Sequence, residues 1–154
     1  MSDKRGIGAK RLLQVKEEFN KIYRLLKDCP VINKIFFIPK AEYISRQKRV
    51  YNALKEKGIS VGMVFCDEHY NGDVPYLGGN TNITVEQVGG IIGRTGFHII
   101  AGLEGGYVSE QLAYRANAKV HKVEMLKLAD EEYPINAEKV EDIIRGITGG
   151  RVKK

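Results

Sequence analysis

Hydrophobic residues recur at steps of three and four through the first part of the chain, and this spacing predicts amphipathic helices. In residues 10–28 the apolar positions are Leu12, Val15, Phe19, Ile22 and Leu26. Pro30 follows and ends this helix, because proline disfavours the helical conformation in the residue before it. A second helix is predicted over residues 40–57, with Gly58 as its C-terminal cap. Its inward face consists of Tyr43, Gln47, Val50 and Leu54.

After Gly58 the pattern becomes one that is typical of strands. The short apolar runs are residues 59–65, 87–93 and 97–101. Arg94-Thr95-Gly96 joins the last two runs and predicts a hairpin turn. Residues 66–82 are predicted to form a long polar loop after the first strand. Glycines at positions 62, 89 and 90 lie inside the predicted strands, which indicates close backbone packing or bulges.

The remaining third of the chain predicts a helix, a strand and a second helix. The first helix, residues 107–116, follows the glycine-rich residues 102–106. In residues 119–125, Val120 and Lys122 alternate with His121 and Val123, which predicts a strand with two different faces. Asn136 is predicted to cap the last helix, and Gly149-Gly150 to end it. The apolar stripe of that helix consists of Val140, Ile143, Ile144 and Ile147.

Interleaved helices and strands that include one hairpin predict an α/β layered domain with a mixed sheet. We expect a helical extension over residues 1–38 and a core domain over residues 39–154. A chain of 154 residues with 43% hydrophobic and 29% charged residues suits one folded domain of this kind. This composition excludes a chain that is mainly disordered.

Location and partners are constrained by what the sequence lacks. No apolar run approaches the roughly 20 residues of a membrane helix, and no apolar stretch follows the charged start of the chain as in a signal peptide. The two cysteines lie far apart and predict no disulfide framework. We therefore expect a cytoplasmic protein without a membrane partner.

The net charge of +6 is uneven, because residues 1–60 contain 15 basic and 6 acidic side chains. A basic half can bind nucleic acid. The lysines and arginines are spread along the predicted helices, however, which favours solvated helix faces. Nucleic acid binding stays an alternative that is not favoured, because no basic patch with interleaved aromatic residues is present.

The middle of the chain resembles a known family. A helix rich in Arg and Lys ends at Gly58 and leads into the first strand, and Tyr76, Leu77 and Gly79 close the following loop. With the order of the later elements, this is similar to the N-terminal domain of the creatinase/prolidase family, the accessory domain of the pita-bread metallopeptidases. The resemblance covers about residues 40–151. Gly78 departs from it, because the family has a hydroxyl residue there.

The resemblance implies a three-layer α/β/α domain related to the ribonuclease H-like arrangement, and a non-catalytic role. Such a domain helps a metal-dependent Xaa-Pro peptidase to form a homodimer, and its first loop shapes a substrate pocket. The family binds its divalent metal through five ligands in a following catalytic domain, which this chain does not contain. We expect no catalytic residue, metal or cofactor in the chain itself, and the catalytic domain of the same or a partner chain as its partner.

The polar loop supplies the candidate binding residues. His69, Asp73, Tyr76, Asn80 and Asn82 are predicted to line a pocket for a peptide or small polar substrate. The alternative is a solvated loop in which Asn and Gly only form turns. Cys66-Asp67-Glu68-His69 contains metal-ligating types, but adjacent residues rarely converge on one ion, and no second Cys/His pair follows.

A stand-alone small-molecule or nucleotide-binding module is the alternative function. Residues 102–106 lie where a phosphate-binding loop precedes a helix, and Glu124 lies where a ribose-binding acid belongs. The spacing is not G-x-G-x-x-G, and Glu104 would lie near the phosphates. His98 is interpreted as a core or interface residue and His121 as a face residue. No nucleophile–histidine–acid triad is indicated, because Ser109 is not in a G-x-S-x-G turn.

Overall fold

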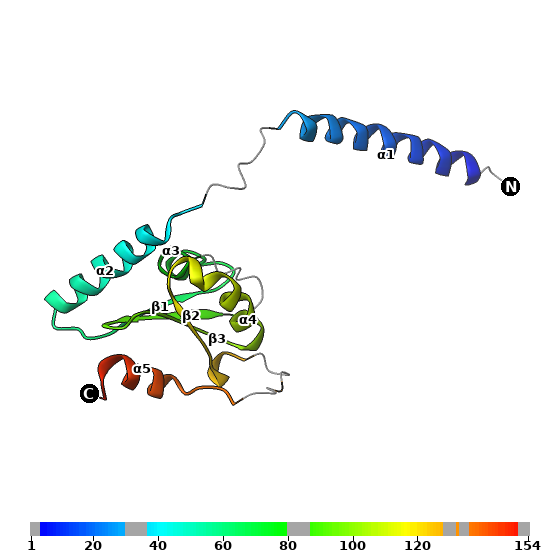
Figure 1. The fold of residues 1–154 in the computed structure, drawn as a ribbon. Coiled ribbons are helices and arrows are strands. Elements are labelled where there is room, and N and C mark those ends of the chain that lie inside the picture. Colours follow the sequence, from blue (N-terminus) through cyan, green and yellow to red (C-terminus); the bar gives the residue numbers. More distant parts are fainter. Residues whose placement is uncertain (1–3, 30–36, 80–86, 128–131, 133–135, 151–154) are drawn as a thin grey trace. The chain divides into compact units, whose positions relative to one another are not determined.

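The computed structural model describes residues 4–29, 37–79, 87–127, 132 and 136–150, with only the backbone for residues 4–7 and 9. Its internal contacts divide the chain into two units, residues 1–37 and 38–154. Figure 1 shows their elements.

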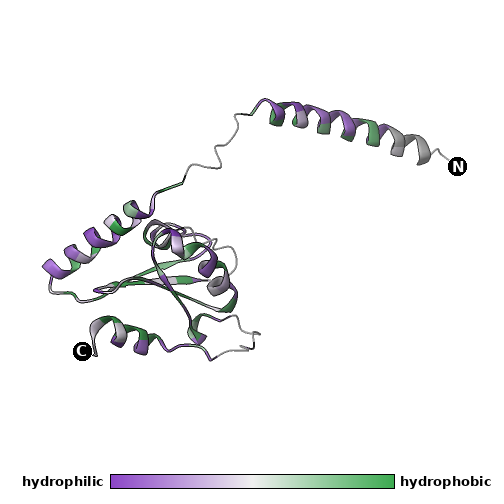
Figure 2. Cartoon of the chain, in the orientation of Figure 1, coloured by the Kyte–Doolittle hydropathy of each residue, from purple (hydrophilic) through white to green (hydrophobic). Residues whose placement is uncertain are grey.

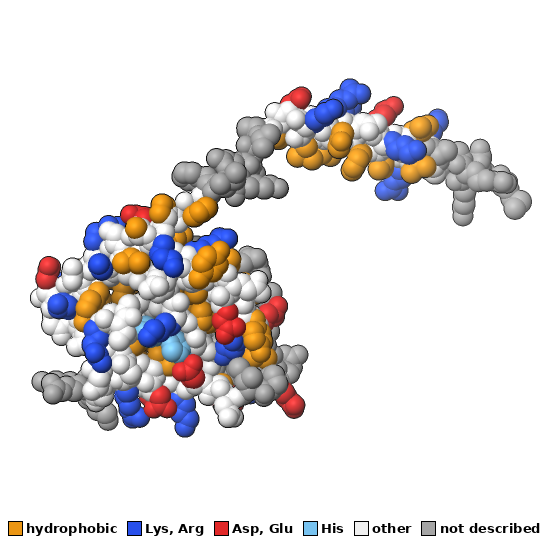
Figure 3. Space-filling model, viewed as in Figure 1, with side chains coloured by type: hydrophobic (Ala, Val, Ile, Leu, Met, Phe, Trp, Pro, Cys, Tyr) orange, Lys and Arg blue, Asp and Glu red, His pale blue; other side chains and the backbone are white. Residues whose placement is uncertain are grey.

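The first unit contains one long helix, α1 (Lys4–Lys27). The helix predicted for this segment is confirmed, although it begins at Lys4 rather than at residue 10. Figure 3 shows hydrophobic side chains along one side of α1 and charged side chains on the other. The stripe residues Leu12, Val15, Phe19, Ile22 and Leu26 are each more than half exposed. In the part of the chain that the structure describes, no helix has the length and hydropathy to cross a bilayer.

The second unit is built on a four-stranded sheet of β1 (Gly62–Cys66), β2 (Val88–Gly93), β3 (Gly96–Ala101) and β4 (Lys119–Lys122). The strands lie in chain order. The β1–β2 and β2–β3 pairs are antiparallel, and the β3–β4 pair is parallel. The mixed sheet and the hairpin turn at Arg94-Thr95 are therefore confirmed.

Four α-helices accompany the sheet: α2 (Lys40–Glu56), α3 (Asp73–Gly78), α4 (Leu103–Leu112) and α5 (Val140–Thr148). Figure 1 shows α2, α3 and α4 on one side of the strands and α5 on the other. We call the first side the α2 face and the second the α5 face. Figure 2 shows strands that are mainly hydrophobic and helices with polar and apolar stripes, as a mixed α/β fold requires.

Two hydrophobic clusters correspond to the two faces. The cluster of the α2 face contains Cys66, Val74, Leu77, Val88, Ile92, Phe97, Ile99, Ala101 and Ala113. The cluster of the α5 face contains Ile91, Ile100, Val123, Ile143 and Ile147. Alternate residues of β2 and β3 belong to different clusters, because successive strand side chains point to opposite faces. The sheet thus buries a separate set of side chains on each of its two sides.

The strand glycines permit close packing, as predicted. A Cβ atom at Gly90 would lie 2.2 Å from Cζ of Phe97, and one at Gly62 would lie 2.7 Å from Cδ1 of Leu54. A Cβ atom at Gly89 would lie 2.8 Å from Cγ1 of Ile100. These separations are too short for real side chains, so the glycines are required where large side chains cross the sheet surface.

Several further predictions differ from the structure, among them the first strand, which was predicted over residues 59–65 and runs over Gly62–Cys66. The polar loop contains α3, because Val74 and Leu77 find buried positions on the sheet. Helix α4 begins at Leu103 rather than residue 107, so it includes the glycines at 105 and 106. The strand predicted to reach residue 125 ends at Lys122, and a 3₁₀ turn, Glu124–Leu126, follows. Asn136 does not cap the last helix, because Glu138 pairs with Val123 in a β-bridge and delays the helix to Val140.

Candidate functional site

The loop after β1 contains three of the five predicted pocket residues within the described part of the chain. Asp67 Oδ1 accepts hydrogen bonds from the backbone N–H groups of His69 and Tyr70, both at 2.8 Å, which closes a tight turn. The His69 imidazole is exposed, with Nδ1 3.6 Å from Oε1 of Glu68. The turn therefore directs His69 into solvent. Asn80 and Asn82 lie outside the described residues.

Asp73 and Tyr76 belong to α3 but have different surroundings. Asp73 lines an open hollow of about 390 Å³ together with Phe65, Tyr70, Asn71 and Gly72. Neither His69 nor Tyr76 lines it. The Tyr76 side chain is 49% exposed, and its ring centroid lies 4.4 Å from Cζ of Arg46. Of the described residues of the predicted set, Asp73 is the one that lines this hollow.

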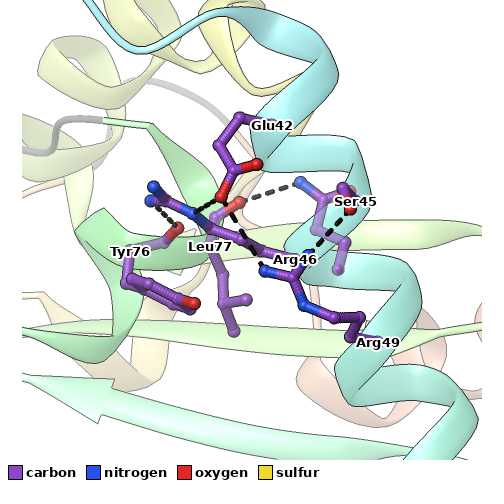
Figure 4. A network of polar contacts seen from close by, with 7 residues as sticks. Glu42, Ser45, Arg46, Arg49, Tyr76 and Leu77 are labelled. Carbon is purple, nitrogen blue, oxygen red and sulfur yellow. Dashed lines mark hydrogen bonds and ion pairs between the residues drawn. The ribbon is translucent and has the colours of Figure 1, made fainter.

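Helix α3 is held by side chains of α2, as Figure 4 shows. The Gln47 amide Nε2 donates to the carbonyl oxygens of Leu77 at 2.8 Å and Ala116 at 2.9 Å. Arg46 Nη1 donates to the carbonyl oxygen of Tyr76 at 3.2 Å. Gln47 is buried, so its amide must find partners within the protein, and the two carbonyl groups provide them. We call these contacts the α2–α3 clamp.

A carboxylate orients the arginine of the clamp. Glu42 Oε1 lies 2.9 Å from Nε of Arg46 and 3.8 Å from Nη2 of Arg49. The hydrogen bond from Arg46 lowers the pKa of Glu42 below 4.5, and the charges of Arg46 and Arg49 add to this effect. Arg46 is thus positioned from one side by Glu42 and from the other by Tyr76.

A smaller cavity of about 230 Å³ lies between α2 and the β2–β3 hairpin. Its lining residues are Ile44, Gln47, Lys48, Tyr51, Ile92, Gly93, Arg94, Gly96 and Asn117. The charged residues among them are both basic, and apolar side chains form part of the wall. Asn117 has a positive φ of 55°, which asparagine tolerates better than most residues. The cavity suits a small molecule with an anionic group.

The α5 face holds a chain of four polar side chains, which we call the histidine chain. Thr95 Oγ1 lies 2.8 Å from Nε2 of His98, and His98 Nδ1 lies 2.9 Å from Nε2 of His121. The other ring nitrogen of His121, Nδ1, lies 2.9 and 3.0 Å from the two carboxylate oxygens of Glu138. The two imidazole rings are stacked, with centroids 5.1 Å apart. The chain connects Thr95, an exposed residue, with the exposed side chain of Glu138.

The environment keeps His98 uncharged. His98 is 5% exposed, and burial lowers its pKa from 6.5 to about 4. Electrostatic interactions with His121 and Lys119 act in the same direction. His98 therefore remains a neutral imidazole at physiological pH, with one nitrogen that donates and one that accepts.

Sequence analysis named both histidines of this chain but missed Thr95 and Glu138 as their partners. The two histidines come together because of the parallel register of β3 and β4, in which Ile100 pairs with His121 and His98 with Lys119. Neither strand pattern predicts that register. Glu138 follows His121 by 17 positions and reaches it through the bridge at Val123, for which the sequence has no local signal.

The other candidates have structural explanations. The side chain of Lys122 occupies the space beside Gly106, where a Cβ atom would lie 2.6 Å from Cγ of Lys122. Ser109 Oγ is buried and has no hydrogen-bond partner among the described residues, so it is not an accessible nucleophile. Cys29 and Cys66 are free thiols. In the described ranges, no three His, Cys, Asp or Glu residues converge as a metal site.

Comparisons with models of protein families, with curated proteins and with solved structures gave no match to this chain. The resemblance to the creatinase/prolidase domain stays a prediction from the sequence.

Proposed function

We propose that the chain is a creatinase/prolidase-type N-terminal domain, a non-catalytic module of a metal-dependent Xaa-Pro peptidase. In this proposal it forms a homodimer, has the three-layer, ribonuclease H-like arrangement of that family, and shapes a substrate pocket for the catalytic domain of the same or a partner chain. The divalent metal belongs to that catalytic domain. Helices on both sides of a mixed sheet support the arrangement.

The α2–α3 clamp is the observation that carries the proposal. The motif residues differ in their surroundings, because Leu77 is buried, Tyr76 is half exposed, and Gly79 adopts a φ of 85° that favours glycine. Gln47 and Arg46 bind the carbonyls of Leu77 and Tyr76, so they fix the end of the loop against α2. A loop held in this way can present its side chains to a neighbouring domain with little loss of conformational entropy.

The departure at Gly78 has a physical reason in this chain. A Cβ atom at Gly78 would lie 2.8 Å from Cε1 of Phe97 and 3.1 Å from Cδ1 of Ile99. The phenyl ring thus fills the space that a hydroxyl side chain would need. The side chain that is missing on α3 is thus replaced in space by the Phe97 ring of β3. The departure therefore does not argue against the family arrangement.

The protein isolated from its source cells tests this function. An antibody against this chain is used to purify the native protein, and hydrolysis of Xaa-Pro dipeptides is measured with and without a metal chelator. We expect chelator-sensitive hydrolysis with the native protein and none with the recombinant 154-residue chain, which should sediment as a dimer. Native protein without such activity would contradict the proposal.

Two substitutions in that native enzyme test the role of the loop. Tyr76→Ala and Asn80→Ala should each raise KM roughly tenfold, the loss expected for one interaction of about 1.4 kcal/mol. Tyr107→Ala is the matched control, because Tyr107 is a half-exposed tyrosine on α4 that contacts Lys122. Equal kinetics in all three variants would exclude the loop from the pocket. His69, Asp73 and Asn82 are the next residues to replace.

A stand-alone small-molecule-binding module is the second candidate, and the 230 Å³ cavity between α2 and the hairpin favours it. A ligand that binds the native state raises the melting temperature by mass action. Small carboxylates and phosphates, including nucleotides, should then stabilise the chain, and Lys48→Gln should remove the effect. Lys55→Gln, outside the cavity on the same helix, should not.

A further inference from the structure

When Glu138 is a carboxylate and both imidazoles are neutral, the histidine chain has one consistent arrangement of protons. The carboxylate can only accept, so Nδ1 of His121 carries a proton and its Nε2 has a free lone pair. This lone pair accepts from Nδ1–H of His98, which leaves Nε2 of His98 as an acceptor. The remaining donor is the Thr95 hydroxyl. All three links therefore point the same way, from hydroxyl to carboxylate.

The surroundings of Thr95 differ from those of a purely structural hydroxyl group. Thr95 is exposed at the tip of the hairpin, so water could satisfy its hydroxyl, yet the hydroxyl is bound to a buried imidazole. Lys119 pairs with His98 on β4, so a positive charge lies near this end of the chain, whereas Nε of Arg94 donates to the carbonyl oxygen of Ile147 at 2.7 Å. The negative group of the chain, Glu138, lies at the opposite end. On α5, Glu141, Asp142 and Arg145 are exposed to solvent.

We infer that Thr95 is a nucleophile for acyl transfer from small activated esters, with His98 as its general base and with His121 and Glu138 as positioning residues. The arrangement has the order of a nucleophile, a base and an orienting acid, with a second imidazole inserted between base and acid. Exposure of Thr95 gives a substrate access without a deep pocket. This activity is separate from the proposed role in a peptidase.

The step balances without any further reactant. Thr95 Oγ1 forms a bond to the ester carbonyl carbon while its proton passes to Nε2 of His98. The carbon–oxygen bond of the ester breaks, and the leaving alcohol takes that proton. Water then attacks the acyl-threonine, its proton passes through Nε2 of His98 to Thr95 Oγ1, and a carboxylic acid is released. During both steps the carboxylate of Glu138 stabilises the positive charge that develops on the two imidazoles.

Acetylation of the full chain by 4-nitrophenyl acetate tests this inference, with the modified residue located by peptide mass spectrometry. We expect an acetyl group on Thr95 that is kept in Thr95→Ser and lost in Thr95→Val, which has nearly the same shape. His98→Gln should slow acetylation of Thr95 about 100-fold, the usual minimum for a lost general base. Thr148→Val is the control, because the Thr148 hydroxyl donates to a helix carbonyl rather than to an imidazole.

Further measurements separate catalysis from structure. In wild type, protonation of His98 should lower the rate only as the pH approaches the His98 pKa of about 4, because burial keeps this imidazole neutral above that pH. Glu138→Gln should lower the rate and Glu138→Asp should restore part of it, with unchanged circular dichroism. Nitrogen NMR shifts should show the proton of His98 on Nδ1. Acetylation confined to lysines, equal labelling of wild type and Thr95→Val, or a proton on Nε2 of His98 would each overturn the inference.

Discussion

Two polar networks, the α2–α3 clamp and the histidine chain, lie on opposite faces of the sheet and use their side chains in different ways. On the α2 face, Gln47 and Arg46 donate to backbone carbonyls, so their hydrogen bonds tie one element to another. On the α5 face, His98 and His121 bind other side chains, and the chain of bonds ends at Thr95 and Glu138. Both faces have buried apolar clusters of their own.

The difference separates a structural network from one that is available for chemistry. A hydrogen bond to a backbone carbonyl can only hold or release an element. The Gln47 amide does not ionise near neutral pH, so it cannot act as an acid or a base. An imidazole can accept a proton at one nitrogen and release one at the other. Substitutions on the α2 face should therefore change stability, whereas those on the α5 face should change pH dependence and reactivity.

The largest effect on stability is expected at Gly90, where the Phe97 ring lies against the backbone of β2. Gly90→Ala would place Cβ 2.2 Å from Cζ of Phe97, so the ring and the strand must shift, and stability should fall by about 3 kcal/mol or more. Gly146→Ala is the matched control in α5, where nothing lies within 4 Å of the new Cβ. That change should stabilise the helix by up to about 1 kcal/mol. Urea unfolding measures the change in stability of both variants. If both lose stability or both gain it, the close packing at Gly90 is contradicted.

On the α5 face, His98 should make stability depend on pH. Its pKa is about 4 when folded and 6.5 in a model peptide, so the unfolded chain binds more protons between these values. Stability should therefore fall as the pH decreases from about 6.5 to 4, by about 3 kcal/mol at 1.36 kcal/mol per pH unit. His98→Leu should remove this dependence when urea unfolding is followed at several pH values. His69→Leu, at an exposed histidine, should leave it unchanged.

The clamp itself should contribute less than the core. In Gln47→Glu a carboxylate replaces the amide and cannot donate to the carbonyls of Leu77 and Ala116. Leaving these groups without partners should cost about 2 kcal/mol in urea unfolding. Gln111→Glu, the same exchange at an exposed position of α4, serves as the control. If both variants lose the same stability, the clamp does not hold α3.

The smallest effect concerns the exposed end of the clamp. The pKa of Glu42 lies below 4.5, because Arg46 donates a hydrogen bond to it and because Arg46 and Arg49 are positively charged. Arg46→Gln should raise this pKa more than Arg49→Gln, as followed by carbon NMR of the carboxyl group. High salt should also raise it, because the pair is solvent-accessible. An unchanged titration in Arg46→Gln would show that the two side chains do not pair in solution.

Sequence analysis predicted most elements because local patterns encode them. The alternation of Val120 with His121 correctly indicated a strand with two faces, and the strand glycines correctly indicated close packing. Helix α3 was missed because six residues are too few for a clear helical period. The Asn136 cap was wrong because the β-bridge at Glu138 keeps the backbone extended beyond it.

The candidate sites were harder to predict, because they depend on contacts between distant segments. The five pocket residues came from one polar loop, and those that are described lie in different surroundings. The histidine chain joins a turn, two strands and the segment before α5. No local sequence pattern indicates this chain, because its hydrogen bonds join residues from different segments.

By itself, the sequence determined the amphipathic helices, the hairpin at Arg94-Thr95 and the alternation of β4, since each depends on neighbours within a few positions. Only the tertiary structure decided which residues share a face. The parallel register of β3 and β4 brings His98 beside His121, and the bridge at Val123 brings Glu138 to His121. Hydrogen bonds act over about 3 Å, whereas these residues are separated by up to 40 positions, so chemistry here follows from strand pairing rather than from local pattern.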